Sequence, residues 1–247
     1  MRNVFKSIAK LVRKSPAIDQ HPWDFAELML LEWMRRRGAA LTVYVVGAYL
    51  GHEVERLLGT GAVDRLVLFE ALPATAERLR KEMRVLGGRV EVVECAVGDH
   101  DGTATFFENN LPGTGSVLPA SLVVQDSDGV KPVYEVEVAA SRLDSFMRAH
   151  GSRPDILWID VQGAEGKVLQ GGKEALRSAR LVFIEVSAWR PAYEGGSVMA
   201  ELTQVLDTFG FRLLQLGTDP LNGTGNALYA KAQIMGLASL AGATTHG

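Results

Sequence analysis

Acidic side chains stand at or near the ends of three apolar runs. Glu70 closes the run LVLFE, Asp160 closes ILWID, and Glu185 lies near the end of LVFIEV. A carboxylate in such a position can accept hydrogen bonds from hydroxyl groups, and it can take a proton from one of them. These residues therefore predict a site that handles hydroxyl groups. For Glu70, an ordinary surface glutamate is the alternative interpretation.

A glycine turn, Gly47-Ala48-Tyr49-Leu50-Gly51, follows the apolar run at residues 41–46. A strand, a glycine turn, a helix and a second strand that ends in an acid make a unit in which a nucleoside can bind. The turn is one residue shorter than the dinucleotide fingerprint and lacks its third glycine, so a nicotinamide-dependent enzyme is the weaker alternative. A turn that serves only chain packing is also open at this point.

The apolar periodicity predicts an α/β fold around these residues. Strands are expected at residues 41–46, 66–70, 90–97, 156–161 and 181–187, followed by a final pair at 211–216 and 227–230. Helices are expected at residues 50–58, 73–86, 143–150, 164–170, 173–179 and 197–209. This alternation favours a mostly parallel sheet with helices on both faces. The carboxyl ends of its strands would form the binding edge, where the acids and the glycine turn fall.

The chain departs from this alternation in its middle part. Residues 103–107 and 134–138 read as an antiparallel pair of strands. The connection between them, residues 109–132, is rich in Gly, Ser, Pro and Asp and is too long for an ordinary loop. We therefore expect this segment to be a lid on the substrate side.

The chain contains no internal repeat or linker, and we expect a single domain at residues 41–235. Residues 1–40 are predicted to be an N-terminal helical extension, because apolar residues recur at helical spacing before Gly38. Its first fourteen residues are basic and amphipathic. A solvated helix is the favoured interpretation, and weak association with an acidic partner or membrane surface is the alternative. Residues 236–247 are expected to be a mobile tail.

The composition argues against several classes of protein. Lys and Arg total 26 against 29 Asp and Glu, so we expect a small ligand and no nucleic-acid partner. No apolar run approaches the roughly 18 residues that span a bilayer, so no integral membrane segment is expected. The single cysteine, Cys95, excludes an intramolecular disulfide, which fits a reducing cytoplasm. The sequence leaves the oligomeric state open.

Seven segments match a known family in order and spacing. They read VYVVGAYLG, LVLFEALP, VEVVECAVGDHDGTATF, GTGSVL, SRLDSF, ILWIDVQGAEGKVLQGG and LVFIEV. Together they resemble the FkbM-type S-adenosylmethionine-dependent methyltransferases over about residues 41–186, and IDVQGAE is the most specific part. The resemblance implies the seven-stranded class I methyltransferase fold with a C-terminal antiparallel hairpin. It also implies methyl transfer, usually to an oxygen of a sugar or natural-product-like acceptor.

The resemblance further implies which residues bind the cofactor, S-adenosylmethionine. The glycine turn, with Gly47, Ala48, Tyr49 and Gly51, would line its methionine part, and Glu70 would bind the ribose hydroxyls. Ala71 and Leu72 would flank the adenine, and Ala96 and Val97 would meet the adenine edge. Ser116 matches a serine of the family in the loop after a hairpin strand, with a plain turn serine as the alternative.

The resemblance places Asp160 in the cleft near the sulfonium. We therefore take Asp160 as the first candidate for the base that deprotonates an alcohol acceptor, and Glu185 as the second. With Glu165, which opens the next helix, these carboxylates could ligate magnesium. Carboxylates near one cleft are not a ligand set by themselves, however, so no metal site is predicted.

Two positions depart from the pattern of the family. Val45 stands where the family usually has an aspartate, and Trp158 stands where it usually has a lysine. Without this carboxylate, either other groups hold the cofactor, or its affinity is reduced, or the protein has lost catalysis; a ligand other than S-adenosylmethionine is also open. The alternative function is therefore a catalytically silent relative that binds a nucleoside ligand or a partner protein.

Overall fold

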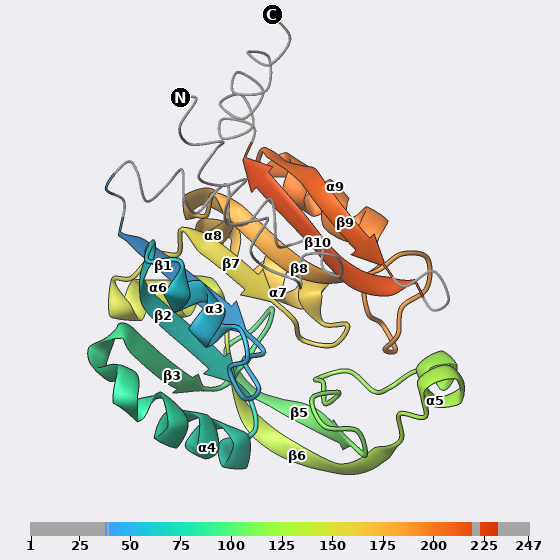
Figure 1. The fold of residues 1–247 in the computed structure, drawn as a ribbon. Helices are drawn as coiled ribbons and strands as arrows, with labels where there is room; N and C mark the ends of the chain where they lie inside the picture. Colours follow the sequence, from blue (N-terminus) through green and yellow to red (C-terminus); the bar gives the residue numbers. More distant parts are fainter. Residues whose placement is uncertain (1–37, 39, 219–222, 232–247) are drawn as a thin grey trace, which may run out of the picture.

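The computed structural model describes residues 38, 40–218 and 223–231. Within this part of the chain, seven strands form the central sheet in the order β3-β2-β1-β7-β8-β10-β9 (Figure 1). The parallel strands are β1 (Leu41–Val46), β2 (Val63–Glu70), β3 (Val90–Glu94), β7 (Ile156–Ile159) and β8 (Leu181–Ser187). The predicted N-terminal helix and C-terminal tail lie outside the described residues.

The last two strands form the expected antiparallel hairpin. β10 (Thr224–Lys231) runs antiparallel to both β8 and β9 (Phe211–Thr218). In the order β3-β2-β1-β7-β8, the chain runs outward in one direction from β1 and in the other direction from β7. The strand order thus reverses between β1 and β7, and such a switch point is the place where open α/β sheets bind ligands. The predicted mostly parallel seven-stranded sheet with a C-terminal hairpin is confirmed.

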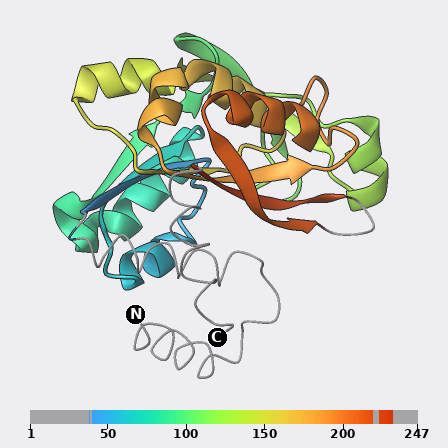
Figure 2. The same cartoon turned by 90° about the horizontal axis from the view of Figure 1, so that it is seen from above.

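Helices cover both faces of the sheet, as Figure 2 shows from above. One face carries α3 (Val54–Gly59) and α4 (Pro73–Met83), and the other carries α6 (Leu143–His150), α7 (Glu165–Gly171), α8 (Lys173–Ser178) and α9 (Met199–Thr208). Successive side chains of a strand point to opposite faces. Val43 of β1 therefore packs with Leu57 of α3, whereas Tyr44 packs edge to face on Phe146 of α6.

Several elements differ from the sequence expectation by a few residues at their ends: the helix expected at residues 73–86 ends at Met83 and a 3-10 helix, Arg84–Arg89, follows it, and β2 begins at Val63 rather than at residue 66. Two differences change the course of the chain. The helix after β1 begins at Val54 rather than at residue 50, because Tyr49 and Gly51 adopt left-handed conformations with φ of 45° and 70°. The strand expected at residues 90–97 is two strands. The Cys95 amide donates to the Val93 carbonyl at 3.2 Å, and this local turn directs the chain out of the central sheet.

The second half of that predicted strand belongs to a smaller sheet. β4 (Ala96–Val97), β6 (Pro132–Ser141) and β5 (Gly102–Asn109) form it in the order β4-β6-β5, and β5 and β6 are antiparallel as expected. The long segment between β5 and β6 contains a helix, α5 (Leu122–Asp128). This segment is therefore structured, and it lies beside the carboxyl ends of the central strands.

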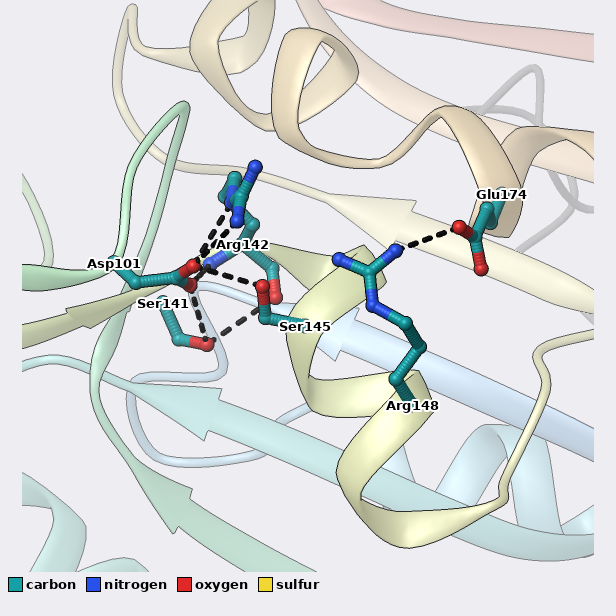
Figure 3. Close-up of polar contacts among 6 residues, drawn as sticks. All are labelled: Asp101, Ser141, Arg142, Ser145, Arg148 and Glu174. Carbon is teal, nitrogen blue, oxygen red and sulfur yellow. Dashed lines mark hydrogen bonds and ion pairs between the residues drawn. The ribbon is translucent and has the colours of Figure 1, made fainter.

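A polar cluster fastens the smaller sheet to the helical layer (Figure 3). Asp101, between β4 and β5, accepts hydrogen bonds from Arg142 Nε at 2.9 Å, from Arg142 Nη2 at 2.7 Å and from Ser145 Oγ at 2.8 Å, at the start of α6. The Arg142 amide also donates to Asp101 Oδ1 at 2.8 Å, and this amide, followed by the Arg142 and Ser145 side chains, holds the pKa of Asp101 well below its usual range. Arg148 continues the connection, because its Nη1 lies 2.7 Å from Glu174 Oε1 of α8. The loop that precedes β5 is thereby held in place.

None of the described helices has the length and apolar character needed to cross a membrane.

Candidate active site

Gly47 brings the ends of β1 and β7 into direct contact. A Cβ atom at this position would lie 1.8 Å from the carbonyl oxygen of Asp160, and the backbone φ is +84°. Both facts require glycine, since other residues carry a Cβ and rarely adopt this conformation. The amides of Gly47 and Ala48 both donate to the Phe69 carbonyl, at 3.0 and 2.9 Å. The glycine turn is therefore fixed between β2 and β7.

Glu70 connects this turn to the end of β2. Its Oε2 accepts a hydrogen bond from the Tyr49 amide at 2.9 Å, and its Oε1 accepts one from the Leu72 amide at 2.9 Å. Burial raises the pKa of Glu70, and these two amides act against that rise. Each carboxylate oxygen has a further lone pair with which it can accept a second donor. Glu70 is thus an oriented acceptor pair rather than a surface glutamate.

A pocket of about 640 Å³, open to solvent, lies at the carboxyl ends of β1, β2 and β7. Eight of the residues predicted from the sequence line it: Gly47, Tyr49, Glu70, Ala71, Leu72, Ala96, Val97 and Asp160. Sequence reasoning missed several further lining residues, among them Cys95, Phe106, Glu108, Gly113, Gly115, Val117 and Gln162. The smaller sheet and the long segment thus supply one wall.

Four predicted residues lie outside the lining of this pocket. Ala48 is buried in the core, and a Cβ at Gly51 would meet Leu79 of α4 at 2.9 Å, so both shape the turn from behind. Ser116 donates to the Val161 carbonyl at 3.2 Å and accepts from the Leu118 amide at 3.1 Å, which ties the long segment to the loop after β7. Glu185 lines an adjacent hollow.

Gln162 joins the two candidate bases. Its amide nitrogen donates to Asp160 Oδ1 at 2.8 Å and to Glu185 Oε2 at 3.0 Å. The backbone of Gln162 has a φ of +54°, which is uncommon for a residue other than glycine and often marks a functional site. The sequence signal for such a turn is the pair Gln162-Gly163, directly after a strand that ends in an acid. The structure therefore brings Asp160 and Glu185 together.

These carboxyl groups lie in a low-dielectric environment that disfavours charge. Burial raises the pKa of Asp160, and hydrogen bonds from Gln162 and Glu185 counteract the rise. The pKa of Glu185 lies well above its ordinary range, because burial and the charges of Asp160 and Glu165 disfavour its ionisation. Burial also raises the pKa of Glu165 to about 7, although its Oε1 accepts from the amides of Val161 and Gly163. The charge of Asp160 thus disfavours ionisation of Glu185.

Glu53 is a further acid near the glycine turn that sequence reasoning missed. Its Oε1 is buried and has no hydrogen-bond partner. Burial, together with the nearby charge of Asp160, raises the pKa of Glu53 to about 7. A buried carboxylate oxygen without a partner is costly, so it is retained only where something else requires it. Within the part of the chain that the structure describes, no group of three or more His, Cys, Asp and Glu is arranged to hold a metal ion.

The two positions that depart from the family pattern lie away from the pocket. Val45 is buried on the face covered by α3, and Trp158 packs against the Phe183 ring with centroids 4.2 Å apart. Neither residue lines the pocket. The departures therefore change the core beneath the sheet rather than the surface that a ligand would touch.

The strand order and the pocket at its switch point define a Rossmann-like α/β fold of the class I methyltransferase type. Residues 46–213 match the family model described as "Methyltransferase FkbM domain". The chain belongs to the FkbM methyltransferase family. The expected family and fold are confirmed.

Two similar proteins support this placement. The chain is 30% identical over 172 residues to the 2-O-methyltransferase NoeI of Sinorhizobium fredii strain NBRC 101917 / NGR234, over 66% of this chain and 70% of that protein. The crystal structure of the methyltransferase FkbM from Methylobacillus flagellatus KT matches with a TM-score of 0.53 at 15% identity. That match covers 77% of this chain, which spans only 43% of the crystallised one, so the likeness concerns the fold alone.

Proposed function

We propose that the protein is an S-adenosylmethionine-dependent O-methyltransferase that acts on a hydroxyl group of a small molecule or glycan. The observation that carries the proposal is the pocket at the switch point, which has Glu70 and Asp160 in its lining. Membership of the FkbM methyltransferase family supports methyl transfer. The 2-O-methyltransferase of Sinorhizobium fredii supports oxygen as the acceptor atom.

The residues around the pocket fit the parts of the cofactor. The free lone pairs of Glu70 suit the two ribose hydroxyls, and the apolar side chains of Leu72 and Val97 suit the adenine. Glu53 lies outside the lining of this pocket, and its buried, unpartnered oxygen beside the glycine turn is the acceptor that we assign to the ammonium of the methionine part. When bound, S-adenosylmethionine supplies an electrophilic methyl group on a sulfonium.

Asp160 is the residue that we assign as the base. Methyl transfer to a hydroxyl breaks a carbon–sulfur bond and forms a carbon–oxygen bond, and the hydroxyl proton must pass to an acceptor. Asp160 lines the pocket that we assign to the cofactor whereas Glu185 does not, so the Asp160 carboxylate is the one placed to take the proton. Glu185, whose pKa is raised well above the ordinary range by burial and by the charges of Asp160 and Glu165, positions Asp160 together with Gln162.

The first test is calorimetric titration of the full chain with S-adenosylmethionine, S-adenosylhomocysteine and NAD. We expect the two sulfur compounds to bind and NAD not to bind. Binding of neither sulfur compound would overturn the proposal, and binding of NAD alone would favour the nicotinamide alternative.

The proposal also covers partners and location. We propose that the protein has no nucleic-acid partner, because its net charge is −3. We propose a cytoplasmic location, because its only cysteine is unpaired.

The second test separates the base from the binding groups. Asp160→Asn should lower turnover strongly, measured as release of S-adenosylhomocysteine in the presence of methyl glycosides, while cofactor affinity is retained. Turnover equal to that of the unmodified protein would show that another residue is the base. Cofactor binding without turnover in the unmodified protein, over the same acceptors, would favour a catalytically silent relative.

A further inference from the structure

Glu108 is a carboxyl group on a strand face that is otherwise apolar. Successive side chains alternate between the faces of a strand, so Glu108 shares the inner face of β5 with Phe106, whereas Thr103 and Thr105 are exposed on the outer face. Phe106 is buried and packs with Val138 of β6. The inner face of a sheet that is solvated on one side normally carries apolar residues. An acid at this position therefore calls for an explanation in the site that the face covers.

The Glu108 side chain lines the cofactor pocket without a partner. A Cβ atom at Gly115, which lines the same pocket, would lie 2.7 Å from Glu108 Oε2, so the glycine leaves room for this carboxylate. Among the described residues, none donates a hydrogen bond to the Glu108 carboxylate or forms an ion pair with it. Burial raises the pKa of Glu108, and no described donor counteracts the rise. The carboxylate is thus left free to interact with a ligand.

The charges around this pocket are of one sign. The described residues that line it include the carboxyl groups of Glu70, Glu108 and Asp160 but no Lys, Arg or His. The charge of Glu108 acts on Glu70 and disfavours its ionisation. Like charges that share a partly desolvated space repel one another, and a cation placed among them relieves the repulsion. No described side chain in the lining supplies this cation, so it is left to the ligand.

We propose that Glu108 determines which form of the cofactor the pocket prefers, because its charge favours S-adenosylmethionine, which has a sulfonium, over S-adenosylhomocysteine, which has a neutral sulfur. The inference rests on the proposed function, because it concerns the cofactor of that reaction. The two compounds differ by one methyl group and by one positive charge at the sulfur. Each carboxylate in the lining therefore stabilises the methyl donor more than the spent product. Glu108 thereby favours replacement of the product by a fresh methyl donor.

The test uses sinefungin, an unreactive analogue that has an amino-bearing carbon in place of the sulfonium and is a cation like S-adenosylmethionine. Calorimetry on the full chain gives the dissociation constants of sinefungin and S-adenosylhomocysteine, with EDTA present so that a metal ion cannot balance the acids. Their ratio measures the preference for the cation. Glu108→Gln should lower this preference about three- to tenfold, which is the effect of one charge in a partly solvated pocket. Its affinity for S-adenosylhomocysteine should be retained or increased, which also shows that the variant is folded.

Two further variants separate charge from shape. Glu108→Asp keeps the charge and should retain the preference for the cation within about twofold. Glu135→Gln, on the exposed outer face of β6, removes one acid from the chain outside the pocket and should leave the preference unchanged. A preference in Glu108→Gln equal to that of the unmodified protein would overturn the inference. Equal losses of affinity for the two ligands would also overturn it, because Glu108 would then bind the nucleoside that they share.

Failure of the proposed function would give a different result. If neither sinefungin nor S-adenosylhomocysteine binds the unmodified protein, the proposed function is overturned and this inference with it. If both bind and the preference for the cation does not depend on Glu108, the proposed function stands and the inference alone is overturned.

Discussion

Val45 of β1 and Trp158 of β7 are neighbours in register across the centre of the sheet. The resemblance to the family implies an acid at the first position and a lysine at the second, so the two departures would replace a pair of opposite charges by an apolar pair. A single replacement would leave one buried charge without a partner, which is strongly destabilising. We therefore interpret the two replacements as a different packing of the core, and not as a loss of the cofactor site.

This relationship predicts a coupling that a double-mutant cycle can measure. Val45→Asp should lower the free energy of unfolding by about 3–5 kcal/mol, because it buries an unpaired carboxylate. Adding Trp158→Lys should recover at least about 1 kcal/mol relative to the sum of the single effects. Urea unfolding gives the four values. The combination of Val43→Asp with Trp158→Lys is the control, because residue 43 is paired with Ile156; equal coupling in both cycles would refute the pairing argument.

Gly47 should be far less tolerant of substitution than a glycine with the same backbone preference elsewhere. Gly47→Ala adds a Cβ against the Asp160 carbonyl, whereas Gly61→Ala has φ of +67° but meets no atom within 4 Å. The control should cost about 1–2 kcal/mol, which is the backbone term alone. We expect Gly47→Ala to cost at least about 2 kcal/mol more, measured by denaturant unfolding. Equal costs would mean that β1 and β7 are not in close contact here.

Glu53→Gln should stabilise the free protein at neutral and basic pH. The raised pKa of about 7 means that the folded protein binds this proton more tightly than the unfolded chain, whose value is near 4.5. The stabilisation from the protonated form is complete below about pH 4.5 and is lost as the pH rises through about 7. The variant lacks this loss, so its stability advantage should grow by up to about 3 kcal/mol between pH 5 and pH 8. A pH-independent difference would argue against a buried, unpartnered carboxylate.

The same variant tests which part of the cofactor Glu53 serves. Glu53→Gln should weaken binding of S-adenosylhomocysteine and leave binding of 5′-methylthioadenosine unchanged, because the second compound lacks the ammonium group. Isothermal calorimetry on both ligands gives the comparison. Equal losses for the two would place the effect on the nucleoside rather than on the amino acid part.

Glu70→Ala should weaken nucleoside binding by about 1.5–3 kcal/mol, which is the usual size of a hydrogen bond to a charged group. Glu94→Ala, at the end of the neighbouring strand and paired with Arg80 on the surface, is the control and should bind normally. Calorimetry with S-adenosylhomocysteine measures both. Unchanged affinity in the Glu70 variant would remove the ribose assignment.

The sequence predicted the layers of the fold because they follow from local periodicity. The strand that ends in Glu70 and the helix that begins at Pro73 appear where apolar spacing and proline placed them. The bend at Cys95 was missed, because a continuous apolar run does not reveal that its two halves join different sheets. That outcome depends on β6, about 40 residues further along the chain.

The candidate site was predictable in its strand-end residues and not in its contacts. Glu70 and Asp160 could be named because parallel strands bring their carboxyl ends to one edge. The bridge from Gln162 to Glu185 joins residues 23 positions apart, and the unpartnered oxygen of Glu53 results from how α3 packs. Both depend on tertiary packing, for which one sequence carries no local signal.

Gln162 lies between two hollows, the cofactor pocket and the adjacent one that Glu185 lines, and this position bears on the order of events in catalysis. Both hollows are open to solvent, so if cofactor and acceptor occupied one each, either could exchange while the other stayed bound. Such an arrangement favours a random kinetic mechanism, in which either substrate combines first with the free protein. Initial-rate patterns would then show each product competing with its own substrate. In a random mechanism of this kind, excess acceptor does not trap the spent cofactor on the enzyme.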